Sequence, residues 1–255
     1  MSNDYAQSYE RNFGFMKDYS REAAFLDRVF KVHGDEVNNV LDIACGPGNH
    51  IRELAHMGYR CAAADIDPEM LAMTQRAAED EGVRIAAHVA DMRDFQLDGT
   101  FDAALNMFYS FQNVLFSADE QARFFKGVSA LLPKGGLFVI ELLPEENNLR
   151  QYPPGQSFVT HRAREDDGST VTVTATNRIL DETTKEIVFR YETAWPDGSV
   201  EHDEMISPIR RVRLAEFDHL VAAAQFERVG AYGDCDLDTP FGEDSAKLVA
   251  VLKKA

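Results

Sequence analysis

The chain has 255 residues, which is enough for one large domain with a single buried core. Its 26 Lys and Arg against 43 Asp and Glu give a formal net charge of −17, which argues against a nucleic acid or an anionic membrane surface as partner. No apolar run approaches the ~20 residues that span a bilayer, and the polar beginning MSNDYAQSYE lacks a signal-peptide pattern. Three separated cysteines indicate neither a disulfide framework nor a metal site, so we expect a cytoplasmic protein without a metal.

Short apolar strands alternate with helices over the first 142 residues. Apolar periodicity predicts a helix over 18–33 and a first strand over 40–44. The next elements in chain order are a helix over 51–57, a strand over 59–64, a helix from Asp67-Pro68 to Glu81, strands over 84–89 and 101–106, a helix opened by the capping box Ser117-x-x-Glu120, and a strand over 137–142. This alternation is typical of a mostly parallel sheet with helices on both faces.

The pattern changes between residues 155 and 212. Thr170–Thr176 and parts of 186–195 alternate with period two, a turn follows at Pro196–Ser199, and 199–211 is a further candidate strand. These features predict an antiparallel insertion, which needs the main sheet, a lid role or another subunit to bury one face.

After the insertion the chain returns to alternating helix and strands, with a helix near 214–225 and strands near 228–234 and 246–252. We therefore divide the chain into a core, 1–154 and 213–255, and an insertion, 155–212, that acts as a lid or as an oligomerisation element. A homodimer is one assembly that this division allows.

The first strand runs into a glycine-rich turn, Cys45-Gly46-Pro47-Gly48. Open α/β sheets bind ligands at the carboxyl ends of their strands, and glycine allows the backbone to approach a ligand closely. Asp65, at the end of the second strand, can accept hydrogen bonds from both hydroxyls of a ribose. Asp91 can accept from an adenine amino group while Met92 packs on the ring. Each feature by itself is also compatible with an ordinary turn, a helix cap or an exposed loop acid.

A dinucleotide-binding site is the natural competitor, because it too uses a glycine loop after the first strand. Its fingerprint has a third glycine for close packing of helix against strand, and here that position is Ile51. A nicotinamide-dependent oxidoreductase is therefore disfavoured but stays an alternative, as does a cofactor-binding protein without catalytic activity.

Four motifs in order carry a family resemblance: Leu41–Gly48, Asp65–Leu71, Asp91–Phe95 and Pro133–Gly136. Together they resemble the class I S-adenosylmethionine-dependent methyltransferases. The resemblance implies an α/β fold with a Rossmann-like, seven-stranded, mostly parallel sheet flanked by helices, and the antiparallel insertion would follow strand five. It also implies S-adenosylmethionine as cofactor and S-adenosylhomocysteine as product.

The resemblance further implies where the cofactor lies. The methionine end would lie over the glycine loop, the ribose at the acid after the second strand, and the adenine near the acid after the third. The residues carried over as cofactor-binding are Tyr19, Ala44, Gly46, Gly48, Asp65, Ile66, Met70, Asp91, Met92 and Met107.

The segments Lys17–Tyr19 and Met107–Phe111, together with the insertion, are similar to glycine N-methyltransferase-like and amino-sugar N-methyltransferase enzymes. This likeness implies a small-molecule acceptor that is methylated on an amine nitrogen. Methylation of an oxygen atom on a small metabolite is the alternative. The sequence departs from the pattern of this group at Gln112-Asn113-Val114, on the acceptor side.

The implied reaction is an in-line displacement at a methyl group, in which correct alignment of the reactants can contribute up to ~7–11 kcal/mol. Tyr109 and Glu141 are the candidate catalytic residues, and Phe108, Asn113 and His161 are the candidate substrate contacts. Glu141 lies in a very apolar strand, where a carboxylate is costly unless it meets a ligand or a partner. It would hold an ammonium or act as a base, or else cap a neighbouring loop. Tyr109 and His161 also have plain alternatives, in core packing and on the surface.

Overall fold

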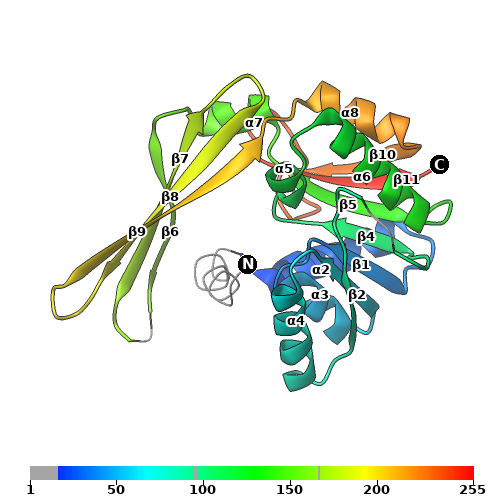
Figure 1. The fold of residues 1–255 in the computed structure, drawn as a ribbon, viewed down its shortest axis with the longest axis horizontal. Helices are drawn as coiled ribbons and strands as arrows, with labels where there is room; N and C mark the ends of the chain where they lie inside the picture. The colour runs from blue at the N-terminus through cyan, green and yellow to red at the C-terminus, as the bar shows by residue number, and fades with distance from the viewer. Residues whose placement is uncertain (1–16, 95–96, 166) are drawn as a thin grey trace.

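The structure, a computed structural model, describes residues 17–94, 97–165 and 167–255. It contains an α/β core and, beside it, a four-stranded antiparallel sheet (Figure 1). Residues 1–16, where the predicted core begins, and Phe95, the end of one resemblance motif, lie outside the described residues.

The core is built on seven strands: β1 (Asn39–Ile43), β2 (Arg60–Asp65), β3 (Ile85–Val89), β4 (Ala103–Asn106), β5 (Leu137–Leu142), β10 (Phe226–Tyr232) and β11 (Leu248–Lys254). Their order in the sheet is β10-β11-β5-β4-β1-β2-β3, and β11 runs opposite in direction to the six other strands. The predicted seven-stranded, mostly parallel sheet is confirmed. Because chain order reverses beside β1, the carboxyl ends of β1 and β4 border a crevice of the kind that binds ligands in open α/β sheets.

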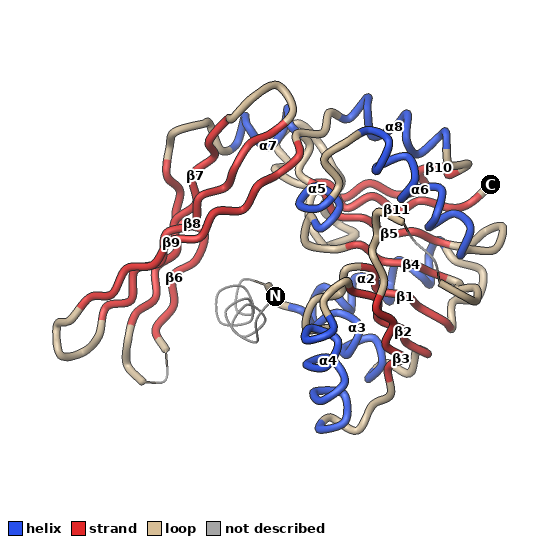
Figure 2. Tube along the Cα trace, in the orientation of Figure 1, coloured by secondary structure: helices blue, strands red, loops and turns tan. Residues whose placement is uncertain are grey.

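Helices cover both faces of this sheet: α2 (Tyr19–His33), α3 (Asn49–His56), α4 (Pro68–Asp80), α6 (Ala118–Leu131) and α8 (Leu214–Ala223). Figure 2 shows α2, α3 and α4 grouped apart from α6 and α8. Local sequence fixes several starts: Asp18 caps α2, Asp67 caps α4 ahead of a first-turn proline, and the predicted capping box of Ser117 and Glu120 opens α6. On one face of the sheet, phenylalanines of α6 pack against phenylalanines of the strands, as Phe124 of α6 does against Phe138 of β5.

Three elements were not predicted: α5 (Ser110–Val114), α7 (Glu145–Gln151) and β6 (Ser157–Arg164). The two helices have five and seven residues, too few for apolar periodicity to stand out. In β6 the pairing register shifts between Val159 and His161, which breaks the alternation that marks a strand.

The insertion folds as an antiparallel sheet of β6, β7 (Thr170–Ile179), β8 (Thr184–Ala194) and β9 (Val200–Arg210), in that order. It stands beside the core and joins it through α7 and the segment after β9 (Figures 1 and 2). A small apolar cluster of Val173, Phe189 and Tyr191 lies on one of its faces. Within the described ranges, no helix combines the length and apolar composition needed to cross a membrane.

Candidate functional site

The turn after β1 contains two residues in the left-handed backbone conformation, which is favourable for one of them and strained for the other. Gly46 has φ 56°, which glycine adopts freely, but Ala44 has φ 55°, which is strained for a residue with a Cβ. The Gly46 N–H donates to Asp65 Oδ2 at 2.9 Å, so the end of β2 fixes the loop at the end of β1. Strain of this kind is characteristic of ligand-binding turns.

Asp65 is the acid that the sequence assigns to a ribose. Its Oδ1 accepts from the Asp67 N–H at 2.9 Å, and its Oδ2 accepts from Gly46. Burial raises the pKa of Asp65, although these backbone hydrogen bonds act in the opposite direction. The carboxylate is thereby oriented at the edge of a cavity, with lone pairs left for ligand hydroxyls.

This first cavity has a volume of about 240 Å³. It brings together seven of the predicted cofactor residues and two of the predicted substrate contacts, from segments that follow β1 to β4. The cofactor residues are Ala44, Gly46, Asp65, Ile66, Met70, Asp91 and Met92, and the substrate contacts are Phe108 and Asn113. Apolar Ile66, Met70 and Met92 offer surfaces to a flat ring, so the lining fits the nucleoside of the predicted cofactor.

Asp91 borders the cavity, but its carboxylate already has a partner. Arg93 donates from Nε and Nη2 to both Asp91 oxygens at 2.7–3.0 Å. This ion pair lowers the pKa of Asp91. Asn113, predicted as a substrate contact, lies here on the cofactor side instead. Its Oδ1 is buried and has no hydrogen-bond partner among the described residues, so it suits an amino-group donor.

A small second cavity adjoins the glycine loop at the position expected for the methionine end of the cofactor. It is lined by Tyr19, Ala44 and Met107, all predicted, and by Asp42 and His50. The rings of Tyr19 and His50 meet edge to face with centroids 4.9 Å apart. Burial raises the pKa of Asp42 to about 7.

Phe108 borders all three cavities of the site. It and Tyr109 follow β4 with φ 56° and 63°, a strained left-handed pair of residues. The Phe108 N–H donates to Glu141 Oε2 at 2.8 Å, which helps to hold this turn. Phe108 therefore marks the place where a cofactor and an acceptor would meet.

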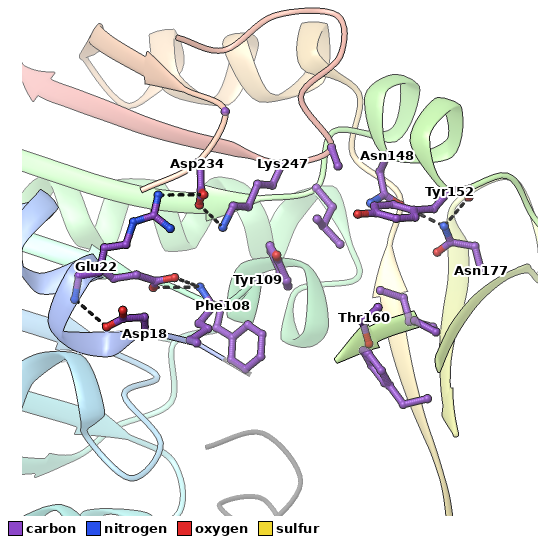
Figure 3. Close-up of a pocket in the computed structure, with 18 residues that line it drawn as sticks. Asp18, Glu22, Phe108, Tyr109, Asn148, Tyr152, Thr160, Asn177, Asp234 and Lys247 are labelled. Atoms are coloured by element: carbon purple, nitrogen blue, oxygen red, sulfur yellow. Dashed lines mark hydrogen bonds and ion pairs between the residues drawn. The ribbon is translucent and has the colours of Figure 1, made fainter. Parts of the chain in front are cut away.

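The third cavity of the site, which is the largest of these three at about 500 Å³, lies between the core and the insertion (Figure 3). Its core side includes Lys17, Glu22, Phe108, Tyr109 and Lys247. Its other side is formed by α7 and by the insertion strands, which contribute Asn148, Tyr152, Thr160, Ala175, Asn177, Ile187 and Phe189. This volume is within the range of small-molecule sites.

Glu141 contradicts the expectation that it serves a substrate as base or as ammonium partner. It is fully buried and pairs with two lysines of the chain, Lys17 at 2.6 Å and Lys247 at 3.3 Å. Burial by itself raises the pKa of Glu141, but the two lysines outweigh burial and hold this pKa at about 2. A carboxylate so acidic is a poor base near neutral pH, and its oxygens are engaged by the chain itself.

Tyr109, the other candidate catalytic residue, lies in the wall of the large cavity. Burial, and next the nearby Glu141 carboxylate, raise the pKa of its phenol. Tyr109 therefore stays protonated near neutral pH. It can accept or donate a hydrogen bond but does not act as a base.

Two other predicted positions have different roles in the structure. Gly48 lines none of the three cavities, and its missing side chain makes room for helix α4: a Cβ there would lie 2.4 Å from Thr74 Cγ2. His161 lies on the insertion sheet opposite Val173, outside the lining of the large cavity, where its neighbour Thr160 contributes instead.

Sequence reasoning gave no role in the site to Lys17, Lys247, Asn148 or Asn177, although Lys17 begins one of the resemblance segments. These single polar residues precede α2 and β11 or lie in α7 and β7, and only tertiary folding brings them to one cavity. The one available signal was Glu141, whose place in an apolar strand requires buried cations somewhere in the fold.

Comparison with known proteins gives a consistent family. A family model described as a methyltransferase domain matches residues 40–136. The chain is 31% identical over 208 residues to a dTDP-3-amino-3,6-dideoxy-alpha-D-glucopyranose N,N-dimethyltransferase of Streptomyces fradiae, covering 82% of this chain and 77% of the relative. It is 25% identical over 237 residues to a glycine/sarcosine N-methyltransferase of Parasynechococcus marenigrum, covering 92% and 78%.

Among solved structures, the fold is similar to that of an amino pentose methyltransferase from Micromonospora echinaspora with S-adenosylmethionine bound. The TM-score is 0.76 at 22% identity, and the likeness covers 100% of this chain and 98% of the other. At this identity the likeness shows the fold alone.

Proposed function

The chain belongs to the class I S-adenosylmethionine-dependent methyltransferases, and on this premise we propose that it methylates the amine nitrogen of an amino sugar. The predicted cofactor, S-adenosylmethionine, and methyl transfer to a small-molecule amine are confirmed by the family. One observation supports the amino-sugar acceptor above others: the Streptomyces fradiae relative, at 31% identity, is an N,N-dimethyltransferase of a 3-amino sugar nucleotide.

The arrangement of cavities fits transfer between two ligands. The two cofactor cavities share Ala44 and Ser110, whereas the 500 Å³ cavity shares only Phe108 with them, so an acceptor beside Phe108 would face the cofactor's methyl group. When bound, the cofactor supplies a methyl group on a cationic sulfur, which becomes neutral on transfer. The chain's part is to align the acceptor nitrogen and exclude water.

Residues of the chain divide this work between them. Asp65, Ile66 and Met70 are placed to hold the nucleoside, and Tyr19 and Met107 the methionine end. The Tyr109 hydroxyl is placed to accept a hydrogen bond from the acceptor N–H, which leaves the nitrogen lone pair free to attack. The insertion acts as a wall or lid over the acceptor. We also propose a cytoplasmic location; the homodimer stays a prediction.

The test is an assay of purified protein with S-adenosylmethionine and dTDP-3-amino-3,6-dideoxy-α-D-glucopyranose. We expect mass spectrometry to detect a sugar that has gained one or two methyl groups, with one S-adenosylhomocysteine formed for each methyl group transferred. The matched 3-hydroxy sugar nucleotide tests oxygen methylation, and sarcosine tests an amino acid acceptor. Turnover of either of these without turnover of the amino sugar would contradict the proposal.

Replacing Tyr109 by Phe should lower kcat by about threefold to tenfold, since it removes one hydrogen bond worth about 0.5–1.5 kcal/mol. The dissociation constant for the cofactor, measured by calorimetry, should not change. Tyr59→Phe is the matched control, because its hydroxyl donates to Asp27 and lies outside the three cavities. Equal loss of kcat in both variants would remove Tyr109 from the mechanism.

A further inference from the structure

We propose that Asn177 and Asn148 form a specificity site for a hydroxyl group on the acceptor, at the end of the large cavity opposite Lys247. This inference rests on the proposed function and adds to it the chemical feature that the enzyme reads. Figure 3 shows Asn148, Tyr152 and Asn177 grouped at one end, with Asp234 and Lys247 beyond Tyr109 at the other.

The orientation of the Asn177 amide is fixed by its own partners. Its Nδ2 donates to the Tyr152 carbonyl at 2.8 Å and to Asn148 Oδ1 at 3.2 Å. A flipped amide would place an oxygen against that carbonyl, so the nitrogen is settled. The Oδ1 atom is left over, on a residue only 5% exposed.

This Oδ1 is buried and has no hydrogen-bond partner among the described residues. A buried acceptor without a donor is unfavourable by about 1–3 kcal/mol, and native structures rarely leave one without a reason. Because Asn177 lines the cavity, a ligand donor is the group that can satisfy this oxygen.

Asn148 supplies the complementary group. Its Oδ1 accepts from Asn177 Nδ2 and from Nζ of the buried Lys185, and these two donors use both acceptor positions of that oxygen. Asn148 is 4% exposed and lines the same cavity, so the group it has left to offer is its Nδ2 donor.

A single hydroxyl matches this pair, because it can donate to Asn177 Oδ1 and accept from Asn148 Nδ2 at once. The same cavity is also lined by apolar Ile187, Phe189 and Leu143, and the Thr160 hydroxyl in its lining already donates to the Val173 carbonyl. A site built to bind a hydroxyl discriminates strongly against the analogue that lacks it, because its polar groups are then left unpaired.

The test compares three acceptors: dTDP-3-amino-3,6-dideoxy-α-D-glucopyranose and its 2-deoxy and 4-deoxy forms. For the wild-type enzyme we expect one of the two deoxy acceptors to show kcat/KM lower by about tenfold to a hundredfold. In Asn177→Leu the ratio of kcat/KM for the parent acceptor to kcat/KM for that deoxy acceptor should fall to between about one and three. The ratio is measured on one preparation, so a lower content of folded enzyme cancels.

Asn39→Leu is the matched control. The Asn39 Nδ2 also donates to a backbone carbonyl, that of Thr100, but the residue lies outside the three cavities, so the wild-type ratio should persist. The inference is overturned if neither hydroxyl matters to the wild type, or if the ratio survives in Asn177→Leu. Equal methylation of all three acceptors would overturn this inference but leave the proposed function intact. If none of the three acceptors is methylated, the inference and the proposed function are both overturned.

Discussion

Glu141→Ala is expected to lower the free energy of unfolding by about 3–5 kcal/mol, because it removes a fully buried carboxylate that pairs with both Lys17 and Lys247. Urea denaturation near pH 7.5 measures the change. Glu204→Ala is the matched control: its exposed pair with Arg190 should contribute no more than about 1 kcal/mol. A loss below about 1 kcal/mol in Glu141→Ala would contradict this account.

The same carboxylate predicts a pH dependence. The pKa of Glu141 in the folded chain, about 2, lies below the ordinary value of 4.5. Its stabilising contribution is therefore complete above the unfolded value and is lost as pH falls from about 4.5 towards 2. The difference in unfolding free energy between wild type and Glu141→Gln should narrow over that interval. A difference that stays constant down to the lower limit would contradict the assigned ion pairs.

Glu141 also affects catalysis indirectly, since it accepts the Phe108 N–H. Phe108 and Tyr109 occupy left-handed conformations that cost free energy unless neighbours hold them. The ion pairs thus position the turn that borders both cofactor and acceptor cavities. Glu141 is a positioning residue, not the base that its place in the sequence suggested.

Gly48→Ala is expected to destabilise the fold by about 2–4 kcal/mol and to weaken cofactor binding at least tenfold. The new Cβ would lie 2.4 Å from Thr74 Cγ2, at a φ of 76° that alanine tolerates poorly. Either α4 must move away or the glycine loop must shift, and both border the cofactor cavity. Thermal unfolding and calorimetry with S-adenosylhomocysteine measure the two effects.

Gly58→Ala is the control that separates two causes of the destabilisation in Gly48→Ala, the steric clash of the new Cβ and the strained backbone conformation. Its φ is 97°, but nothing lies within 4 Å of the added Cβ, so only the backbone penalty of about 1–2 kcal/mol applies and cofactor affinity should persist. Adding Thr74→Ala to Gly48→Ala should recover part of the loss, because it removes the two closest atoms. Equal losses in Gly48→Ala and Gly58→Ala would exclude the contact with Thr74.

The sequence by itself determined most of the elements and their order, with α5, α7 and β6 as the exceptions. Helix caps at Asp67 and Ser117 and the apolar runs at β1 and β5 are local signals, carried by residues close together in the chain. The cofactor cavity was predictable for the same reason. Its lining comes from residues that directly follow parallel strands, and parallel strands end at one edge of the sheet.

The acceptor side was decided by tertiary structure alone. Lys17, Glu141 and Lys247 are separated from one another by more than a hundred residues along the chain. Because Glu141 pairs with both lysines, this predicted catalytic residue is a buried structural group. Asn148 and Asn177 meet only because the insertion sheet docks beside α7. Burial and the identity of neighbours set the pKa and the free hydrogen-bonding groups of a polar side chain, and neither is encoded in local sequence.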